Sequence, residues 1–196
     1  MPPMRDAPSV HAEDRAAWRS WLAANHATAT GVWLVSWRKG HGPRVEYEDA
    51  VEEALCFGWI DSQGGNLDDR RSRQYFAPRK ATSGWAATNK ARIERLIADG
   101  RMAPAGLAAI ERAKANGSWT LLDDVEQGRI PDDLAAALAA HPAAAGRFDA
   151  FPKSAKRAML EWVAQARRAE TRATRVREIA ERAARGERAG PAARRD

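Results

Sequence analysis

The chain has 196 residues, of which 44% are hydrophobic and 30% charged, the balance of a globular protein. At this length a chain buries about 70% of its unfolded surface, so its core needs no disulfide or metal. The single cysteine, Cys56, excludes an intramolecular disulfide and any metal site built from several cysteines. No run reaches the ~18 apolar residues of a membrane-spanning helix, and no secretory signal is recognisable, so we expect a cytoplasmic protein.

The net charge of +6 is unevenly distributed along the chain. Residues 1–150 contain 19 Lys and Arg against 20 Asp and Glu, whereas residues 151–196 contain 13 against 6. The basic character therefore belongs to the C-terminal segment. Residues 186–196, mostly Gly, Ala, Pro and Arg, predict a disordered basic tail, and residues 1–10 predict a flexible N-terminus.

The first elements are a helix and a strand. A helix is predicted over residues 12–25, because Trp18, Trp21 and Leu22 form one apolar stripe at helical spacing. Residues 31–38 place apolar side chains on both faces of an extended segment, which is typical of a strand covered on both sides. We therefore place this strand at the centre of a sheet.

A second helix and a hairpin follow. The helix is predicted over residues 46–57, with acidic residues in its first turn, where the helix dipole favours anions, and Gly58 at its end. Strands at 59–66 and 70–77 surround a polar turn and predict a β-hairpin, in which Gly64 indicates a bulge.

The rest of the chain is predicted to be helical. Several helices begin near prolines suited to a first helical turn: Pro104, Pro131, Pro142 and Pro152. The fold class is therefore α+β, with a small three-stranded, mainly antiparallel sheet, about seven helices and an all-helical C-terminal half. We expect a single domain over residues 11–185, with an α/β half at 11–100 and a helical half at 101–185.

A search for catalytic motifs is mostly negative. The sequence has no phosphate-binding loop, no dinucleotide-binding fingerprint and no nucleophile elbow. Its four histidines are scattered singly, without the spacing that places two ligands on one helix face. We therefore expect no metal and no cofactor, and the residues alone identify no catalytic group.

The hairpin is the most informative polar segment. Asp61 and its polar neighbours follow two apolar residues in a strand, so their side chains must face water or find partners. Candidate residues for a ligand pocket are Asp61, Gln63, Arg73, Arg79, Trp85 and Asn89. The alternative is that ion pairs and hydrogen bonds among them only fasten the hairpin to a helix.

Two charged helix faces have simpler interpretations. The carboxylates Glu48, Asp49, Glu52 and Glu53 are interpreted as a solvated helix face. A basic patch is formed by Arg168, Arg172, Arg175 and Arg182 on the last helix. This patch suits phosphate contact, but Glu178 and Glu181 also stand where they can pair with arginines of the same helix.

The segment from Glu52 to Ser62, Glu-Glu-Ala-Leu-Cys-Phe-Gly-Trp-Ile-Asp-Ser, resembles the signature of the YdeI/OmpD-associated family, also called bacteriocin-protection proteins. The similarity continues collinearly over about residues 11–185. It includes Gly31-Val32-Trp33-Leu34, Phe76-Ala77-Pro78-Arg79-Lys80, Ser83-Gly84-Trp85, Asn89-Lys90 and Pro131-Asp132-Asp133-Leu134. One departure is Ala166-Arg167-Arg168-Ala169, which stands where Ala-Lys-Arg-Pro is usual.

The resemblance implies a bacterial cytoplasmic protein associated with tolerance of bacteriocins, antimicrobial peptides or envelope stress, with no established reaction or cofactor. We expect a non-enzymatic protein that binds a small polar ligand or a protein partner near Asp61. The alternatives are an enzyme whose acid is Asp61 or Glu53, with Arg79 holding an anionic substrate, and, less favoured, nucleic-acid binding through the basic patch. The sequence selects no interface for a homodimer.

Overall fold

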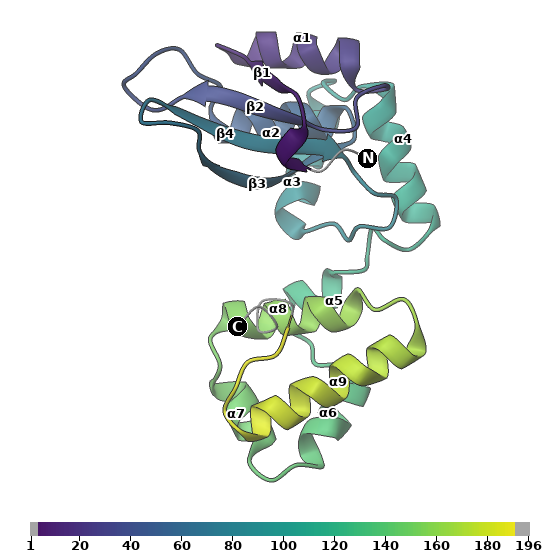
Figure 1. Ribbon diagram of the computed structural model, residues 1–196. Coiled ribbons are helices and arrows are strands. Elements are labelled where there is room, and N and C mark those ends of the chain that lie inside the picture. The colour runs from purple at the N-terminus through teal and green to yellow at the C-terminus, as the bar shows by residue number, and fades with distance from the viewer. Residues whose placement is uncertain (1–3, 191–196) are drawn as a thin grey trace. The chain divides into compact units, whose positions relative to one another are not determined.

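The computed structural model describes residues 4–190 (Figure 1). The chain divides into two compact units: residues 1–83 with 88–118, and residues 84–87 with 119–196. The first unit is α+β. In the described residues the second unit is entirely helical.

The first unit contains one mixed four-stranded sheet with the strand order β1-β2-β4-β3. The strands are β1 (Ser9–His11), β2 (Val32–Trp37), β3 (Trp59–Asn66) and β4 (Arg71–Pro78). Strand β1 runs parallel to β2, whereas β2 and β3 both run antiparallel to β4. The prediction of three mainly antiparallel strands was therefore wrong in one element, because β1 has only three residues and shows no alternating pattern.

The helices occupy most of the predicted segments. Within residues 4–190 they are the 3-10 helix η1 (Met4–Asp6) and the α-helices α1 (Arg15–Asn25), α2 (Tyr47–Cys56), α3 (Ala87–Ala98), α4 (Pro104–Ala115), α5 (Asp123–Glu126), α6 (Asp132–Ala139), α7 (Ala144–Ala150), α8 (Lys153–Ala164) and α9 (Ala169–Ala184). The described residues thus form more α-helices than the roughly seven that we expected, and the short α5 is one that no start signal in the sequence indicated.

The two faces of the sheet have different covers. Phe76 of β4 points toward α1, where the Trp18 ring lies 5.2 Å from it and donates its indole N–H to the Ala50 carbonyl of α2. On the opposite face the Trp33 indole donates to the Met4 carbonyl at 2.8 Å, so η1 covers this side (Figure 1). The predicted burial of β2 on both faces is confirmed.

The second unit has its own core. Leu134, Phe148, Met159 and Ile179 are at most 1% exposed and belong to one cluster. Residues 186–190 contain no helix, and Ala189 is buried against this cluster; the rest of the predicted tail, residues 191–196, lies outside the described residues. None of the helices in the described part combines the length and apolar character needed to span a bilayer.

Candidate functional site

Asp61 lies near the start of β3, with two polar side chains directed at it. The Tyr47 hydroxyl, from the first residue of α2, donates to Asp61 Oδ2 at 2.7 Å. Gln74 Nε2 of β4 lies 3.3 Å from the same oxygen. Partial burial of the phenol, followed by its hydrogen bond to Asp61, raises the pKa of Tyr47 to about 12. The carboxylate therefore connects α2 with the hairpin.

A bulge in β3 permits this arrangement. The register between β3 and β4 shifts between Asp61 and Gly64, as the sequence predicted. Gly64 lies opposite Gln74, and a Cβ at position 64 would collide with Gln74 Oε1. The Gln74 side-chain amide also donates to the Ser62 carbonyl at 3.1 Å. This hydrogen bond stabilises the bulge and orients the amide.

Two arginines place positive charge near Asp61. Burial lowers the pKa of Arg79 to about 10, and the negative charge of Asp61 opposes this shift. Arg92 of α3 makes two hydrogen bonds of 2.7 Å to Glu48, and this pairing is the main reason that its pKa is raised, with a smaller contribution from Asp61. Arg92 also donates to Asn89 at 2.7 Å, so Asn89 is connected with Glu48 through Arg92.

A pocket of about 390 Å³ lies between the sheet and the segment leading into α2. It is lined by Leu34, Ser36, Trp37, Arg44, Val45, Glu46, Tyr47, Ala50, Gly64, Gly65, Asn66, Ser72, Arg73 and Gln74. We call it the Asp61 pocket, because Tyr47 and Gln74 line it and both contact Asp61. Its volume is that of a small-molecule site.

Of the sequence-predicted site residues, Arg73 alone is among those that line this pocket. Gln63 is exposed within the bulge. Arg73 projects from the opposite face of the sheet to Gln74, and its guanidinium lies 4.3 Å from the Trp33 ring centroid. Trp85 belongs to the second unit, where it is 2% exposed and packs against Trp119. The structure therefore brings together Asp61, Arg79 and, through Arg92, Asn89.

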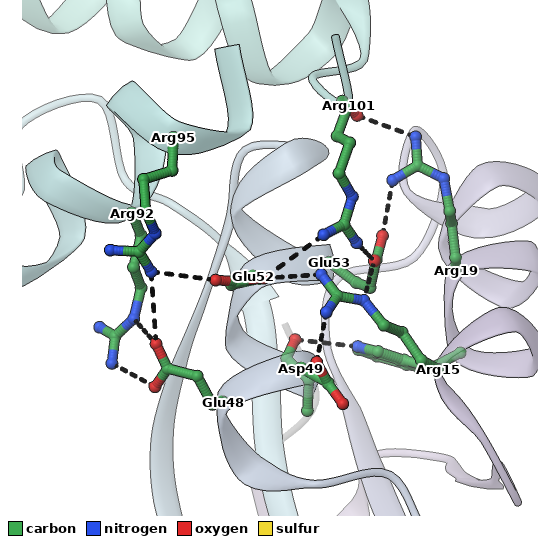
Figure 2. Close-up of polar contacts among 11 residues, drawn as sticks. Arg15, Arg19, Glu48, Asp49, Glu52, Glu53, Arg92, Arg95 and Arg101 are labelled. Carbon is green, nitrogen blue, oxygen red and sulfur yellow. Dashed lines mark hydrogen bonds and ion pairs between the residues drawn. The ribbon is translucent and has the colours of Figure 1, made fainter. Parts of the chain in front are cut away.

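The carboxylate face of α2 is an ion-pair network (Figure 2). Glu53 is 1% exposed and pairs with Arg15 and Arg19, each at 2.6 Å, and with Arg101. Its three neighbours on α2 also pair with arginines: Glu48 with Arg92, Asp49 with Arg15, and Glu52 with Arg15 and Arg95. The interpretation of a solvated helix face was wrong for Glu52 and Glu53, which are 12% and 1% exposed, because the partner arginines come from α1, α3 and the residue that precedes α4 by three positions.

The basic patch of α9 is largely engaged within the second unit. Arg172 makes two hydrogen bonds to Asp133, at 2.7 and 2.9 Å. Arg175 donates to the Trp162 carbonyl at 2.5 Å and lies over the Trp162 ring. Arg182 pairs with Glu178 at 3.4 Å, and Arg168 is the N-cap residue of α9. These contacts leave fewer free cations for nucleic-acid phosphates than the sequence indicates.

The second unit has a larger hollow of about 550 Å³ between α6 and α9. Its floor is apolar, with Ala137, Ala173, Val176 and Ala180, and the Asp133–Arg172 pair lies at its rim. The described residues contain no cluster of three or more His, Cys, Asp or Glu side chains able to hold a metal ion. Cys56 is fully buried, and burial raises the pKa of its thiol.

Comparison with protein families divides the chain at about the same place as the fold. Residues 10–109, half of the chain, match the family described as Domain of unknown function (DUF8412). Residues 128–186 match the family described as Bacteriocin-protection, YdeI or OmpD-Associated. No curated protein and no solved structure matches the chain. The chain therefore belongs to the DUF8412 family, and the match of its helical part supports the resemblance to the YdeI or OmpD-associated bacteriocin-protection family.

Proposed function

We propose that the first unit binds a small polar ligand in the Asp61 pocket. The observation that carries this proposal is the convergence of Tyr47 and Gln74, two lining residues, on one carboxylate. Binding sites commonly combine a concave surface with a few polar groups held in fixed orientation, and a shared carboxylate supplies that orientation.

The accessible polar atoms suit a ligand with both donors and acceptors. Tyr47 is 55% exposed, and because its proton is donated to Asp61, its oxygen is left to accept a hydrogen bond. Ser36, Ser72 and Asn66 add hydroxyl and amide groups along the sheet. A contact that only fastened the hairpin to α2 would not require these further groups to line the same cavity.

The biological role proposed for this binding is tolerance of bacteriocins, antimicrobial peptides or envelope stress in the cytoplasm of a bacterium. Support comes from the description of the matched family and from the resemblance of residues 52–62 to its signature. We propose a non-enzymatic role, since Glu53, the other candidate for a catalytic acid, forms ion pairs with three arginines. Asp61 with Arg79 remains the pair for an enzymatic alternative.

Thermal unfolding of the full-length protein against a panel of metabolites, nucleotides and cationic peptides tests the binding proposal, since a ligand of the native state raises the midpoint. We expect at least one compound to raise the midpoint of the wild-type protein and to lose its effect in Asp61→Asn and Tyr47→Phe. The control is Asp124→Asn, an exposed carboxylate of the second unit. A compound equally effective on all variants contradicts the site, and turnover of a bound compound favours the enzyme.

The physiological role is tested in a bacteriocin-sensitive bacterium that expresses the protein. We expect the wild-type protein to raise the bacteriocin concentration needed to stop growth, and Asp61→Asn at equal abundance to lose most of that effect. If both proteins protect equally well, the protection does not depend on the Asp61 pocket.

A further inference from the structure

Basic side chains gather at the end of the sheet beside the Asp61 pocket. The loop after β2, residues 38–44, contains three Lys and Arg and no acidic residue. The segment 66–73, which closes the β3–β4 hairpin, adds three arginines and two aspartates. Folding joins these segments, because the Arg38 backbone N–H donates to the Arg70 carbonyl at 2.9 Å and Trp37 pairs with Arg71. The net charge of residues 1–150, which is only −1, gives no sign of this local concentration of positive charge.

Some of these charges are compensated. Arg44 pairs with Glu46 at 2.5 Å, and Arg71 pairs with Asp68 at 2.6 Å. Glu46 and Asp68 are therefore already paired with cations of the same segments, and Asp69 is the remaining carboxylate of the segment 66–73.

Other charges at this end have no such compensation. Arg38 and Lys39 directly follow the pocket residue Trp37, and Arg70 stands two residues before Ser72. Arg38 donates to the Asp69 carbonyl, which is neutral, at 3.1 Å. Across residues 4–190, no carboxylate oxygen lies within ion-pair distance of Arg38, Lys39, Arg70 or Arg73.

We propose that the ligand of the Asp61 pocket carries a phosphate group, which binds beside the pocket at Arg38, Lys39 and Arg70. These three exposed residues do not line the pocket, but they are close in sequence to its lining residues Trp37 and Ser72. This inference rests on the proposed function and specifies its ligand. Exposed arginines and a lysine on two segments that folding joins suit a group of two negative charges, and guanidinium groups bind phosphate oxygens through paired N–H donors. The remainder of the ligand then lies against Tyr47 and Gln74.

The ligand is a small molecule in this proposal. A cavity of about 390 Å³ accommodates the body of a phosphorylated metabolite. Within it, Tyr47 and Gln74 offer hydrogen-bonding groups, and the negative charge of Asp61, which both contact, disfavours a second phosphate beside them.

Isothermal titration calorimetry of the full-length protein tests this inference with glucose 6-phosphate and AMP, each against its phosphate-free counterpart, glucose or adenosine. We expect at least one phosphorylated probe to bind at least tenfold more tightly than its counterpart, with affinity falling as salt rises. Arg38→Gln/Arg70→Gln should weaken binding at least tenfold, whereas Arg112→Gln/Arg129→Gln, which removes the same charge from exposed positions on α4 and after α5, should not.

Three results would overturn the inference in distinguishable ways. If a phosphate-free compound of the wider panel binds and is lost in Asp61→Asn, while the phosphorylated probes do not bind, the pocket stands and its phosphate end is wrong. If a probe binds equally well to Arg38→Gln/Arg70→Gln and to Asp61→Asn, it binds outside the pocket and contradicts both proposals. A preference for single-stranded RNA over both small probes would also exclude the small-molecule ligand.

Discussion

Among single residues, Tyr47 reports most directly on the polar group around Asp61. Its pKa of about 12 results from partial burial and from its hydrogen bond to Asp61. We expect absorbance near 295 nm to show one tyrosinate forming above pH 11, which Tyr47→Phe removes and which Asp61→Asn moves to lower pH. Because the folded pKa is raised, this tyrosine stabilises the fold below pH 10 and loses that effect as pH rises toward 12. If the tyrosinate that Tyr47→Phe removes forms near pH 10 in the wild-type protein, the hydrogen bond between Tyr47 and Asp61 is contradicted.

Substitution by alanine should change the stability of the protein in opposite directions at two glycines. A Cβ at Gly106 of α4 would collide with the Cys56 backbone carbonyl of α2, which cannot move aside as a side chain can. Gly106→Ala should therefore destabilise the protein by about 1–3 kcal/mol. A Cβ at Gly146 of α7 meets nothing within 4 Å, so Gly146→Ala should stabilise by about 0.5–1 kcal/mol. Urea unfolding measures both, and equal effects of the two substitutions would contradict the α2–α4 packing.

At the scale of the helices, the ion-pair network fastens α2 to α1 and to the segment before α4. Glu53→Gln removes the most buried carboxylate of the network, which three arginines share, so like charges remain together in a partly buried place. We expect a loss on the order of 3 kcal/mol in the free energy of unfolding, the low end for a broken buried pair, since the arginines are about one-third exposed.

The matched control for this change is Glu48→Gln on the same helix. Glu48 is 52% exposed and its pairing with Arg92 is open to solvent, so its loss should cost less than about 1 kcal/mol. If both variants unfold at the same urea concentration, Glu53 does not have the central role that Figure 2 indicates.

Local sequence patterns predicted the main elements of the first unit, but they did not predict the contacts between residues far apart in the sequence. The alternation in residues 31–38 was enough to place β2, and Gly64 was enough to indicate the bulge. Strand β1 was missed because its three residues pair with β2 only through tertiary contact. The acidic face of α2 resembled a solvated surface because Arg15 and Arg101 are more than 30 residues from Glu53 along the chain.

The same limit applies to the candidate site. Asp61 was found because polar residues follow two apolar residues in its strand, but Tyr47 lies at helical spacing from apolar residues of α2 and gave no signal of its hydrogen bond. Arg73 was expected beside Asp61, yet strand alternation directs it to the other face, over Trp33. The register of a bulged hairpin decides such placements, and sequence spacing alone does not.

At the scale of the whole molecule, acid should weaken both units. Hydrogen bonds to arginines lower the pKa of Glu48 in the first unit and of Asp133 in the second. A carboxylate with a lowered folded pKa contributes stability above its unfolded pKa, about 4, and loses it as pH falls through the folded pKa. We expect a flat urea midpoint from pH 5 to 8, a fall below pH 4, and a smaller fall in Asp133→Asn.

The most direct test of the Asp61 pocket is an NMR titration of the ¹⁵N-labelled full-length protein with the compound that most raises its unfolding midpoint. The account predicts saturable shifts of the backbone amides of Ser36, Asn66 and Ser72, which line the pocket, and none of these shifts in Asp61→Asn. Saturable shifts confined to Ala137, Ala173 and Ala180 would instead place the ligand in the α6–α9 hollow of the second unit and contradict the proposed site.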